Sequence, residues 1–424
     1  MRTFMRILPL LATAGAFAAP PAFEPNYDEA KIPPHTLPDP LKGEDGTPVK
    51  SAAEWTSKRR GEILALFETN VYGKTPEVAK RTKLTARPGK TVSNFLNGKA
   101  TLREAALILP SEKGEIALNL MIVTPNAAKG AVPAFLGLNF KGNHSIHPDP
   151  RITLSTSWMR PDKEGGVVDN RATEACRGIA QSRWPLEKII DRGYALATMY
   201  YGDIDPDFDD GFENGIHAAF GKPGPEEWGS IGAWSWGLSR ALDYLETDTA
   251  INAKQVAVLG HSRLGKTSLW AGAQDERFGI VISNDSGCGG AALSRRAIGE
   301  TVGRINTSFP HWFCDRFLDY NENENACPVD QHELIALMAP RPVYVASAVE
   351  DTWADPKGEF LSAKLAGPVY ALFGKNGVGV EEQPGIDHPV GDAVGYHIRT
   401  GKHDVTDFDW EQYLSFADRH FARK

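Results

Sequence analysis

The chain has 424 residues, of which 42% are hydrophobic and 24% charged, and this composition excludes a disordered, collagenous or coiled-coil protein. Its net charge of −8 is unfavourable for nucleic-acid binding, because neutralising phosphates requires clustered Lys and Arg. Four cysteines are too few for a disulfide scaffold, so a hydrophobic core must hold the fold together.

The first 18 residues have the pattern of a secretory signal. Arg2 and Arg6 precede an apolar run at 7–17, and Ala-Phe-Ala at 16–18 is typical of a cleavage site. No later stretch reaches the roughly 18 apolar residues that a membrane span needs. We therefore expect a secreted or periplasmic protein without a membrane span. In that oxidising compartment the cysteines could form three pairings or stay as free buried thiols; they are Cys176, Cys288, Cys314 and Cys327.

Residues 19–50 are rich in proline, which favours an extended arm or a short linker. A helix is then predicted over 54–72, where apolar residues recur at helical spacing until Gly73 and Pro76 end it. No repeat or second change in composition follows. We interpret residues 51–424 as one domain.

Apolar, β-branched runs bounded by turn residues recur along this domain, with helical patterns between several of them. Paired early strands followed by strand-helix alternation predict an α/β protein, a three-layer αβα sandwich around a mixed, mostly parallel sheet. Reactive groups in such sheets gather at the carboxyl ends of the strands. Strands are predicted at 105–109, 116–123, 132–139, 195–201, 255–260, 279–283, 342–348 and 396–399, and helices at 231–245 and 263–274.

The segment 256–266, Val-Ala-Val-Leu-Gly-His-Ser-Arg-Leu-Gly-Lys, carries the most informative motif. A buried strand is predicted to end at Gly260, Ser262 follows, and a helix begins at once. Small residues around a Ser at such a turn let its hydroxyl project from a strained elbow, above a helix N-terminus that favours negative charge. The alternative is a Ser that only caps the helix. The spacing is Gly-x-Ser-x-x-Gly rather than the usual Gly-x-Ser-x-Gly.

A nucleophilic Ser needs a base within hydrogen-bond reach and an acid that orients the base. In α/β-hydrolases the chain order is Ser, acid, then His near the C-terminus. His403 fits, on a Gly-containing loop after the last predicted strand, and Asp351 and Asp285 each follow a predicted strand, so both remain candidates for the acid. The other histidines near these segments are expected to be structural, with the ring next to the elbow pointing away from it: His261, His388 and His397.

Gly260-His-Ser-Arg-Leu-Gly265 resembles the Gly-Cys-Ser-Arg-x-Gly signature of the glucuronoyl esterases, carbohydrate esterase family 15, whose bacterial members carry His before the Ser. The likeness runs from about residue 55 to the C-terminus and includes the segments 283–290, 311–314 and 339–342 and the loop with His403. Members are single-domain α/β-hydrolases that cleave the ester between a 4-O-methyl-glucuronic acid branch of xylan and a lignin alcohol. The resemblance therefore implies a serine esterase acting on glucuronoxylan or lignin-carbohydrate esters. We also expect a monomer and no cofactor.

The resemblance also implies roles for single residues. Fungal members place a Glu at the position of Asp285, whereas other bacterial members place the acid at Asp351 or have both, so Asp351 is favoured and Asp285 stays a second candidate. The remaining roles are a nucleophile at Ser262, a general base at His403, an oxyanion contact from the backbone and guanidinium of Arg263, and sugar contacts from Lys266, Glu300 and Trp353.

Several other segments give weaker indications of function. Carboxylates alternate at 203–209, but an EF-hand loop needs Gly and Glu where Phe208 and Asn214 stand, so no metal is expected. Residues 139–143 follow a central strand, where a second oxyanion N–H usually arises. Alternative functions are an acetyl xylan esterase or broader carboxylesterase and, in another class, an inactive carbohydrate-binding relative. Loop or pocket positions are expected for His144 and His147, whereas Arg177 and Arg183 either approach an acidic xylan or are ordinary surface residues.

Overall fold

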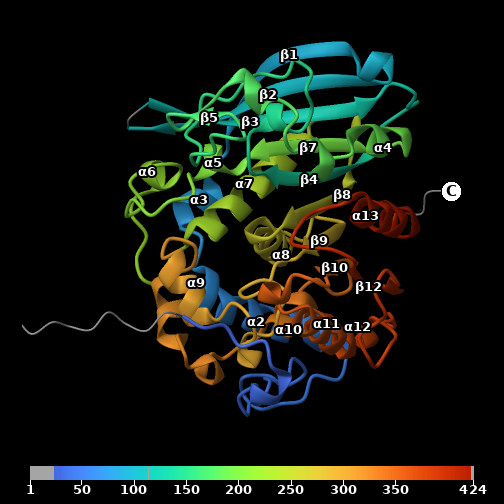
Figure 1. Cartoon of the computed structure of the whole chain (residues 1–424). Helices are drawn as coiled ribbons and strands as arrows, with labels where there is room; N and C mark the ends of the chain where they lie inside the picture. The colour runs from blue at the N-terminus through green and yellow to red at the C-terminus, as the bar shows by residue number, and fades with distance from the viewer. Residues whose placement is uncertain (1–22, 113, 422–424) are drawn as a thin grey trace, which may run out of the picture.

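The computed structural model describes residues 23–112 and 114–421, and a ten-stranded sheet organises them in the order β1-β2-β3-β7-β4-β8-β9-β10-β12-β11 (Figure 1). The strands from β7 to β12 in that order are parallel, and β1, β2, β3 and β11 pair antiparallel. The strand bounds are β1 Thr85–Phe95, β2 Ala100–Ser111, β3 Gly114–Pro125, β4 Val132–Asn139, β5 Val167–Val168, β6 Arg171–Ala172, β7 Ala195–Tyr200, β8 Ile251–His261, β9 Ile280–Asn284, β10 Val343–Ala348, β11 Val390–Gly391 and β12 Val394–Arg399.

Helices cover both faces of this sheet, which confirms the predicted three-layer α/β architecture (Figure 1). Helices α4 and α13 contact one face, and α7, α8 and α11 contact the other. The helix bounds are α1 Ala52–Glu54, α2 Arg60–Phe67, α3 Glu77–Arg81, α4 Leu186–Asp191, α5 Tyr201–Ile204, α6 His217–Phe220, α7 Ser230–Leu245, α8 Arg263–Gln274, α9 Val302–Ser308, α10 Gln331–Ala336, α11 Pro356–Leu365, α12 Gly367–Leu372 and α13 Asp407–His420.

The central strands are buried on both faces, and successive residues divide between two cores as the strand period requires. Along β8, Val258 joins the core under α7 and α8, whereas Ala257 and Leu259 join the core under α4 and α13. Trp270 on α8 and Trp410 on α13 are fully buried in these two cores. Burial of this apolar surface fixes the strand ends, and therefore the loops that follow β8, β9, β10 and β12.

Predicted and observed elements differ most at the edge of the sheet. Strand β1 was not predicted, because it is almost entirely exposed and carries Pro88, Gly89 and two irregularities in its register with β2. The predicted helix at 54–72 is continuous from Ala52 but contains π-helical turns at Trp55–Arg59 and Glu68–Tyr72. All four cysteines are free and buried, so the structure forms none of the possible disulfides.

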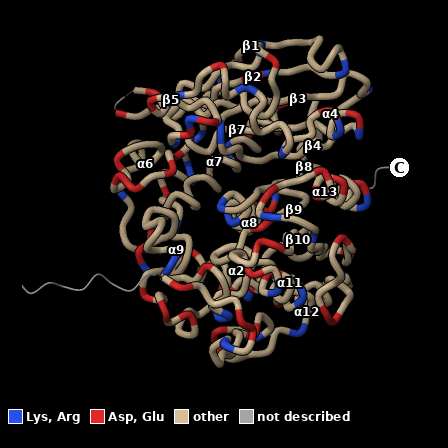
Figure 2. Tube along the Cα trace, in the orientation of Figure 1, with Lys and Arg blue, Asp and Glu red and all other residues tan. Residues whose placement is uncertain are grey.

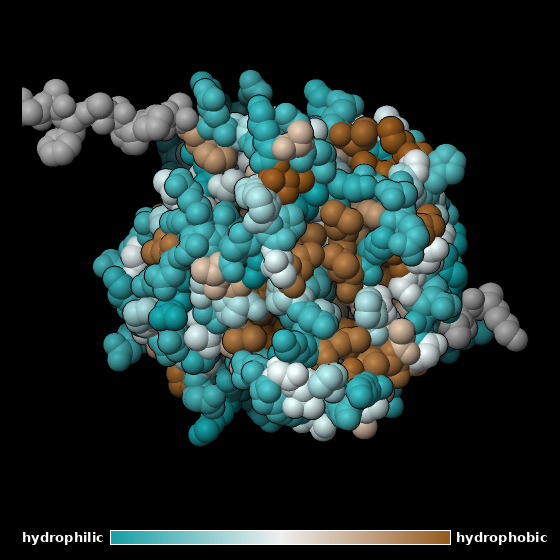
Figure 3. Space-filling view, turned by 90° about the horizontal axis from the view of Figure 1, so that it is seen from below, coloured by the Kyte–Doolittle hydropathy of each residue, from teal (hydrophilic) through white to brown (hydrophobic). Residues whose placement is uncertain are grey.

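The surface of the described residues is polar and mixed in charge. Lys and Arg are dispersed among Asp and Glu over the molecule (Figure 2), and the face seen from below shows hydrophobic residues between hydrophilic ones (Figure 3). Within residues 23–112 and 114–421, no helix combines the length and hydropathy that crossing a bilayer requires. The predicted signal at 1–18 lies outside the described residues.

Residues 23–50 follow the surface with one short 3₁₀ turn, Glu29–Lys31. The carbonyl of Asn26 accepts a hydrogen bond from Gly299 N at 2.8 Å, and the ring of Phe23 lies edge-on to Trp353 with 6.0 Å between ring centroids. This segment therefore contacts loops that carry two of the residues expected to bind sugar.

Candidate active site

Ser262 stands on a strained turn between β8 and α8. Its φ of 58° and ψ of −129° are unfavourable for a residue with a side chain, and such strain is typical of a nucleophile elbow. The turn is held because Ser262 N donates to Asn284 O at 2.9 Å. A Cβ at Gly260 would lie 1.8 Å from Leu264 O, so glycine is required two residues before the Ser.

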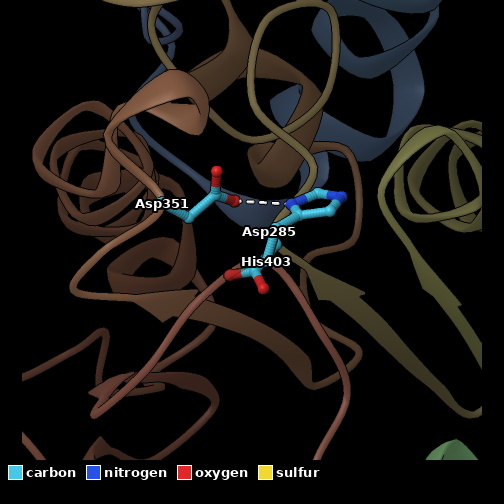
Figure 4. Close-up of side chains that lie close together, drawn as sticks. All are labelled: Asp285, Asp351 and His403. Atoms are coloured by element: carbon cyan, nitrogen blue, oxygen red, sulfur yellow. Dashed lines mark hydrogen bonds and ion pairs between the residues drawn. The ribbon is translucent and has the colours of Figure 1, made fainter.

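His403 and Asp351 form a hydrogen-bonded pair (Figure 4). The Nδ1 atom of His403 lies 2.6 Å from Oδ2 of Asp351, and because a carboxylate accepts, Nδ1 carries the proton and Nε2 is left as the basic nitrogen. Asp351 is buried, whereas the His403 side chain is 42% exposed. The pair comes from the loops after β10 and β12.

Ser262 and His403 line the same cavity, which has a volume of about 390 Å³ and is also lined by Phe140, Arg263 and Tyr201. No hydrogen bond joins Ser262 to His403 among the described contacts of these two residues, and catalytic hydrogen bonds often shorten only when substrate is bound. The arrangement therefore places a serine hydroxyl and an imidazole at one pocket, with a carboxylate hydrogen-bonded to the imidazole, and these are the three groups that nucleophilic catalysis by serine requires.

Asp285, the second candidate for the acid, lies close to this pair but hydrogen-bonds elsewhere. Its Oδ2 accepts from Arg399 and from Asp404 N, both at 3.3 Å, and its φ is 44°. Burial, and then the charges of Glu359 and Asp351, raise the pKa of Asp285 well above its ordinary value. One possible metal-ligand atom from each of Asp285, Asp351 and His403 lies within 4.8 Å of the others, so the spacing would suit a cation. The Nδ1 atom of His403 is already hydrogen-bonded to Asp351, however, and is not free to bind a metal.

Arg263 reaches the cavity from the first position of α8 and is anchored by Asp207. Its guanidinium donates to Asp207 Oδ2 and lies over the ring of Trp312, 4.8 Å from the centroid. Burial alone would raise the pKa of Asp207, but the hydrogen bond from His311 and the charge of Arg263 lower it below its ordinary range. Further hydrogen bonds to the Asp207 carboxylate come from His311 Nε2 at 2.9 Å, Trp312 Nε1 at 2.8 Å and the Tyr201 hydroxyl at 2.9 Å.

This role of Asp207 was not foreseen in the sequence. The alternating acidic residues at 203–209 are used by protein donors: Asp203 accepts from Ser157 and Asp205 from Ser230, each at 2.5 Å. All three of these aspartates are buried. A usable signal was the Asp-Pro-Asp step at 205–207, which follows β7 and the short helix α5, because a buried carboxylate there requires a cationic or polar partner.

Lys266, Glu300 and Trp353 form a row that begins one helical turn after the nucleophile. Lys266 Nζ lies 2.6 Å from Ser286 O and 3.7 Å from Glu300 Oε2, and Glu300 N donates to Trp353 O at 3.0 Å. The Lys266 and Glu300 side chains are only 5% and 9% exposed. These contacts bring together the three residues expected to bind sugar, and none of the three is among the residues that line the cavity of Ser262 and His403.

Glu359 is a buried carboxyl that sequence reasoning missed. It accepts from Ser286 N at 2.8 Å, from Gly287 N at 3.0 Å and from the Ser347 hydroxyl at 2.6 Å. Burial raises the pKa of Glu359 to about 8. The carboxyl thereby holds the backbone at Ser286 and Gly287, directly after Asp285. The carbonyl of Ser286 in turn binds Lys266.

One histidine prediction was wrong. His261 does not point away from the elbow: it lines the catalytic cavity, its ring centroid lies 4.4 Å from that of His403, and its Nδ1 lies 2.5 Å from Asn284 Oδ1. The loop with His403 closes over this strand end, which no local pattern shows. Histidines 388 and 397 lie away from Ser262, with contacts to Ile386 O and to Tyr344 and Asp409 respectively.

The remaining candidates take supporting positions. Asn139 and Asn143 are buried and joined by a 2.8 Å hydrogen bond that holds the loop after β4. Arg183 lines the catalytic cavity and pairs with Asp404. His144 is buried, and Arg177 pairs with Glu174. His147 lines a separate surface hollow beside Trp184.

Comparison with known proteins identifies the family. The family model described as "Glucuronyl esterase, fungi" matches residues 218–374. The chain is 53% identical to a carbohydrate esterase, MZ0003, from an unknown prokaryotic organism, over 96% of this chain and 94% of that protein. A CE15 esterase from a marine bacterial metagenome, described as promiscuous, matches with a TM-score of 0.87 and 52% identity over 94% of this chain and 100% of that chain. The chain belongs to carbohydrate esterase family 15.

A glucuronoyl esterase from Solibacter usitatus is 48% identical, with a TM-score of 0.87 over 92% of this chain and 100% of that chain. A more distant structure, from Sporotrichum thermophile, shares 20% identity with a TM-score of 0.62 and shows the fold alone; that protein is described in complex with methyl 4-O-methyl-β-D-glucopyranuronate. Together with the family model, these relatives confirm a bacterial glucuronoyl esterase of the α/β-hydrolase fold, and therefore a carboxylic ester hydrolase.

Proposed function

We propose that this glucuronoyl esterase is a secreted serine esterase that hydrolyses esters of (4-O-methyl-)glucuronic acid, as in the lignin-carbohydrate links of glucuronoxylan, through Ser262, His403 and Asp351. One observation carries the proposal: His403, oriented by Asp351 at 2.6 Å, lines the cavity into which the strained Ser262 turn opens. A base held in one tautomer beside a nucleophile at a strand-to-helix turn is the arrangement that acyl transfer requires.

The reaction proceeds through an acyl-enzyme. His403 Nε2 accepts the proton of the Ser262 hydroxyl while the oxygen attacks the ester carbonyl, and the resulting imidazolium gives that proton to the departing alcohol. Water then attacks the acyl-enzyme with His403 again as base, which releases the uronic acid and restores Ser262. Arg263 stabilises the oxyanion with its guanidinium and with its N–H, which needs no helical partner at the first position of α8.

The acid side of the substrate is assigned to the row of Lys266, Glu300 and Trp353. A neutral ester offers no charge to these groups, so recognition rests on hydrogen bonds to the sugar hydroxyls and on contact with the indole ring. Lys266 and Glu300 are almost fully buried and paired with each other, so they are pre-oriented and lose little freedom on binding.

The test is hydrolysis of methyl 4-O-methyl-glucuronate by S262A. We expect no turnover above the uncatalysed rate, with an unchanged urea-unfolding midpoint. The matched control is S268A on the same helix, because the Ser268 hydroxyl is buried and bonds Gly265 O and Ile282 O without facing the cavity. Turnover by S262A at the wild-type rate would refute the nucleophile.

A broader carboxylesterase is the second candidate, because one relative at 52% identity is described as promiscuous. The ratio of kcat/KM for a methyl glucuronate ester to that for an aryl acetate separates the two, since an acetyl esterase gains nothing from the uronic acid. We also propose cleavage after Ala18, an arm at 19–50, a catalytic domain at 51–424 and a monomer. N-terminal sequencing of exported protein and its sedimentation test these points.

A further inference from the structure

Arg399, the last residue of β12, is almost fully buried and makes contacts with every nitrogen of its guanidinium. Its side chain is 2% exposed. Two of its partners are the carboxylates of Asp285 and Asp409, which belong to different elements of the fold. The distances are 2.7 Å from Nε to Asp409 Oδ2, 3.1 Å from Nη1 to Thr400 O, and 3.3, 3.0 and 2.6 Å from Nη2 to Asp285 Oδ2, Lys402 O and Asp404 O.

Three of these partners are backbone carbonyls of the loop that carries His403. A single nitrogen, Nη2, binds the carbonyls of Lys402 and Asp404 on either side of the histidine. The same loop contains Gly401 at φ 105°, so its backbone has an intrinsically wide choice of conformations. The hydrogen bonds from the guanidinium restrict the backbone conformation at Lys402 and Asp404, the residues on either side of the base.

The carboxylates complete the clamp. Asp285, after β9, also accepts from Asp404 N at 3.3 Å, and Asp409, in the first turn of α13, accepts from Thr406 N at 2.7 Å. Arg399 therefore joins the end of β12, the His403 loop, the loop after β9 and the start of α13 through one planar group.

We propose that Arg399 is a positioning residue for the reaction: it fixes the His403 loop so that the imidazole meets both Asp351 and Ser262. This inference rests on the proposed role of His403 as general base. Arg399 does not line the catalytic cavity, so it acts through the loop. Lysine cannot replace it, because an ammonium group lacks the planar fork that binds carbonyls and carboxylates in different directions at once.

The test compares R399K and R399M with a control at Arg341. Arg341 is also a carbonyl-binding arginine, with contacts to Gly272 O at 2.7 Å and Phe278 O at 3.1 Å, but it lies at the opposite, amino-terminal end of β10. Urea unfolding gives the folded fraction, and kcat and KM for methyl 4-O-methyl-glucuronate are then expressed per folded molecule. The rate at which a fluorophosphonate labels Ser262 reports activation of the hydroxyl independently of the sugar.

We expect R399K and R399M to lower kcat and the labelling rate by about 100-fold, the cost of an ångström-scale misplacement of a catalytic group, with KM within about twofold. R341K and R341M lose stability but keep kcat. R399K retains the positive charge beside Asp285 and Asp409, so it folds even where R399M does not.

Two results overturn the inference: folded R399K with kcat and labelling within about twofold of wild type, or a rise in KM with kcat retained. A failure of the proposed function looks different, since wild-type enzyme would then resist the fluorophosphonate at Ser262. That result would refute the role of His403 as general base, and therefore also the role of Arg399 in positioning it.

Discussion

Asp207 offers the sharpest test of how the site is built, because its carboxylate receives only donors. His311 and Trp312 donate to Oδ1, and Arg263 donates to Oδ2. In D207N the amide nitrogen must face one of these sets of donors, so at least one set loses its acceptor. With Oδ1 kept toward the rings, the amide nitrogen faces the groups that contact Oδ2, which are the guanidiniums of Arg263 and Arg160 and the Tyr201 hydroxyl.

The expected cost has two parts. Breaking a buried ion pair from one side destabilises by about 3–5 kcal/mol, and the lower end applies because the Arg263 side chain is 21% exposed and water can reach it. Loss of one oxyanion donor lowers kcat by about 10²- to 10³-fold. We therefore expect D207N to be less stable by about 3 kcal/mol and its kcat to fall nearly as far as that of R263A.

The assay is a double-mutant cycle on kcat for methyl 4-O-methyl-glucuronate, with urea unfolding monitored in parallel. If Asp207 acts through Arg263, the double variant D207N/R263A is no slower than R263A, since coupled residues are not additive. Asp205 provides the matched control, because it is equally buried but bonds Ser230, so D205N keeps kcat per folded molecule. Multiplicative losses in the double variant would refute the reasoning.

Three further predictions follow from single contacts. Glu359 has a pKa of about 8 in the folded protein against 4.5 when unfolded, so between these pH values the folded state binds the proton more strongly. The free energy of unfolding should therefore fall by roughly 3–5 kcal/mol as pH rises from about 4.5 to 8. Urea titrations of E359Q should lack that fall, and the same dependence of unfolding free energy on pH in E359Q as in wild type contradicts the assignment. D351N should lower kcat by about 10⁴-fold, as loss of the orienting acid does, and D285N by far less; the reverse ranking moves the acid to Asp285. G260A, whose Cβ would lie 1.8 Å from Leu264 O, should give no folded protein by circular dichroism, and a folded, active variant would show that the elbow tolerates a side chain.

Local chemistry made the elbow predictable from the sequence. The pattern around Ser262 combines a buried strand, small residues and a helix start, and each depends on neighbours within a few positions. The predicted helix 263–274 matches α8 for the same reason. Chain order and strand ends are also the basis on which His403 and Asp351 are predicted as base and acid, and the structure places the two side chains in hydrogen-bond contact.

What the sequence left open depends on residues distant in the chain. Asp207 meets His311 and Trp312 about a hundred positions later, and Glu359 holds a loop more than seventy positions earlier. His261 was misplaced because strand alternation describes the sheet but not the loop from His403 that closes over it. Such contacts depend on the topology of the whole fold, so they cannot be predicted from a local sequence pattern.

The two candidate acids also illustrate why geometry decides roles that residue type leaves equal. Asp285 and Asp351 both follow strands. The Oδ2 atom of Asp285, however, accepts hydrogen bonds from Arg399 and from a backbone N–H, and burial raises the pKa of Asp285. These surroundings disfavour negative charge on Asp285 and so weaken it as a partner for an imidazolium, whereas Asp351 accepts directly from Nδ1 of His403. In the proposed mechanism Asp351 therefore orients the base, and Asp285, through Arg399, helps to hold the loop from which the base projects.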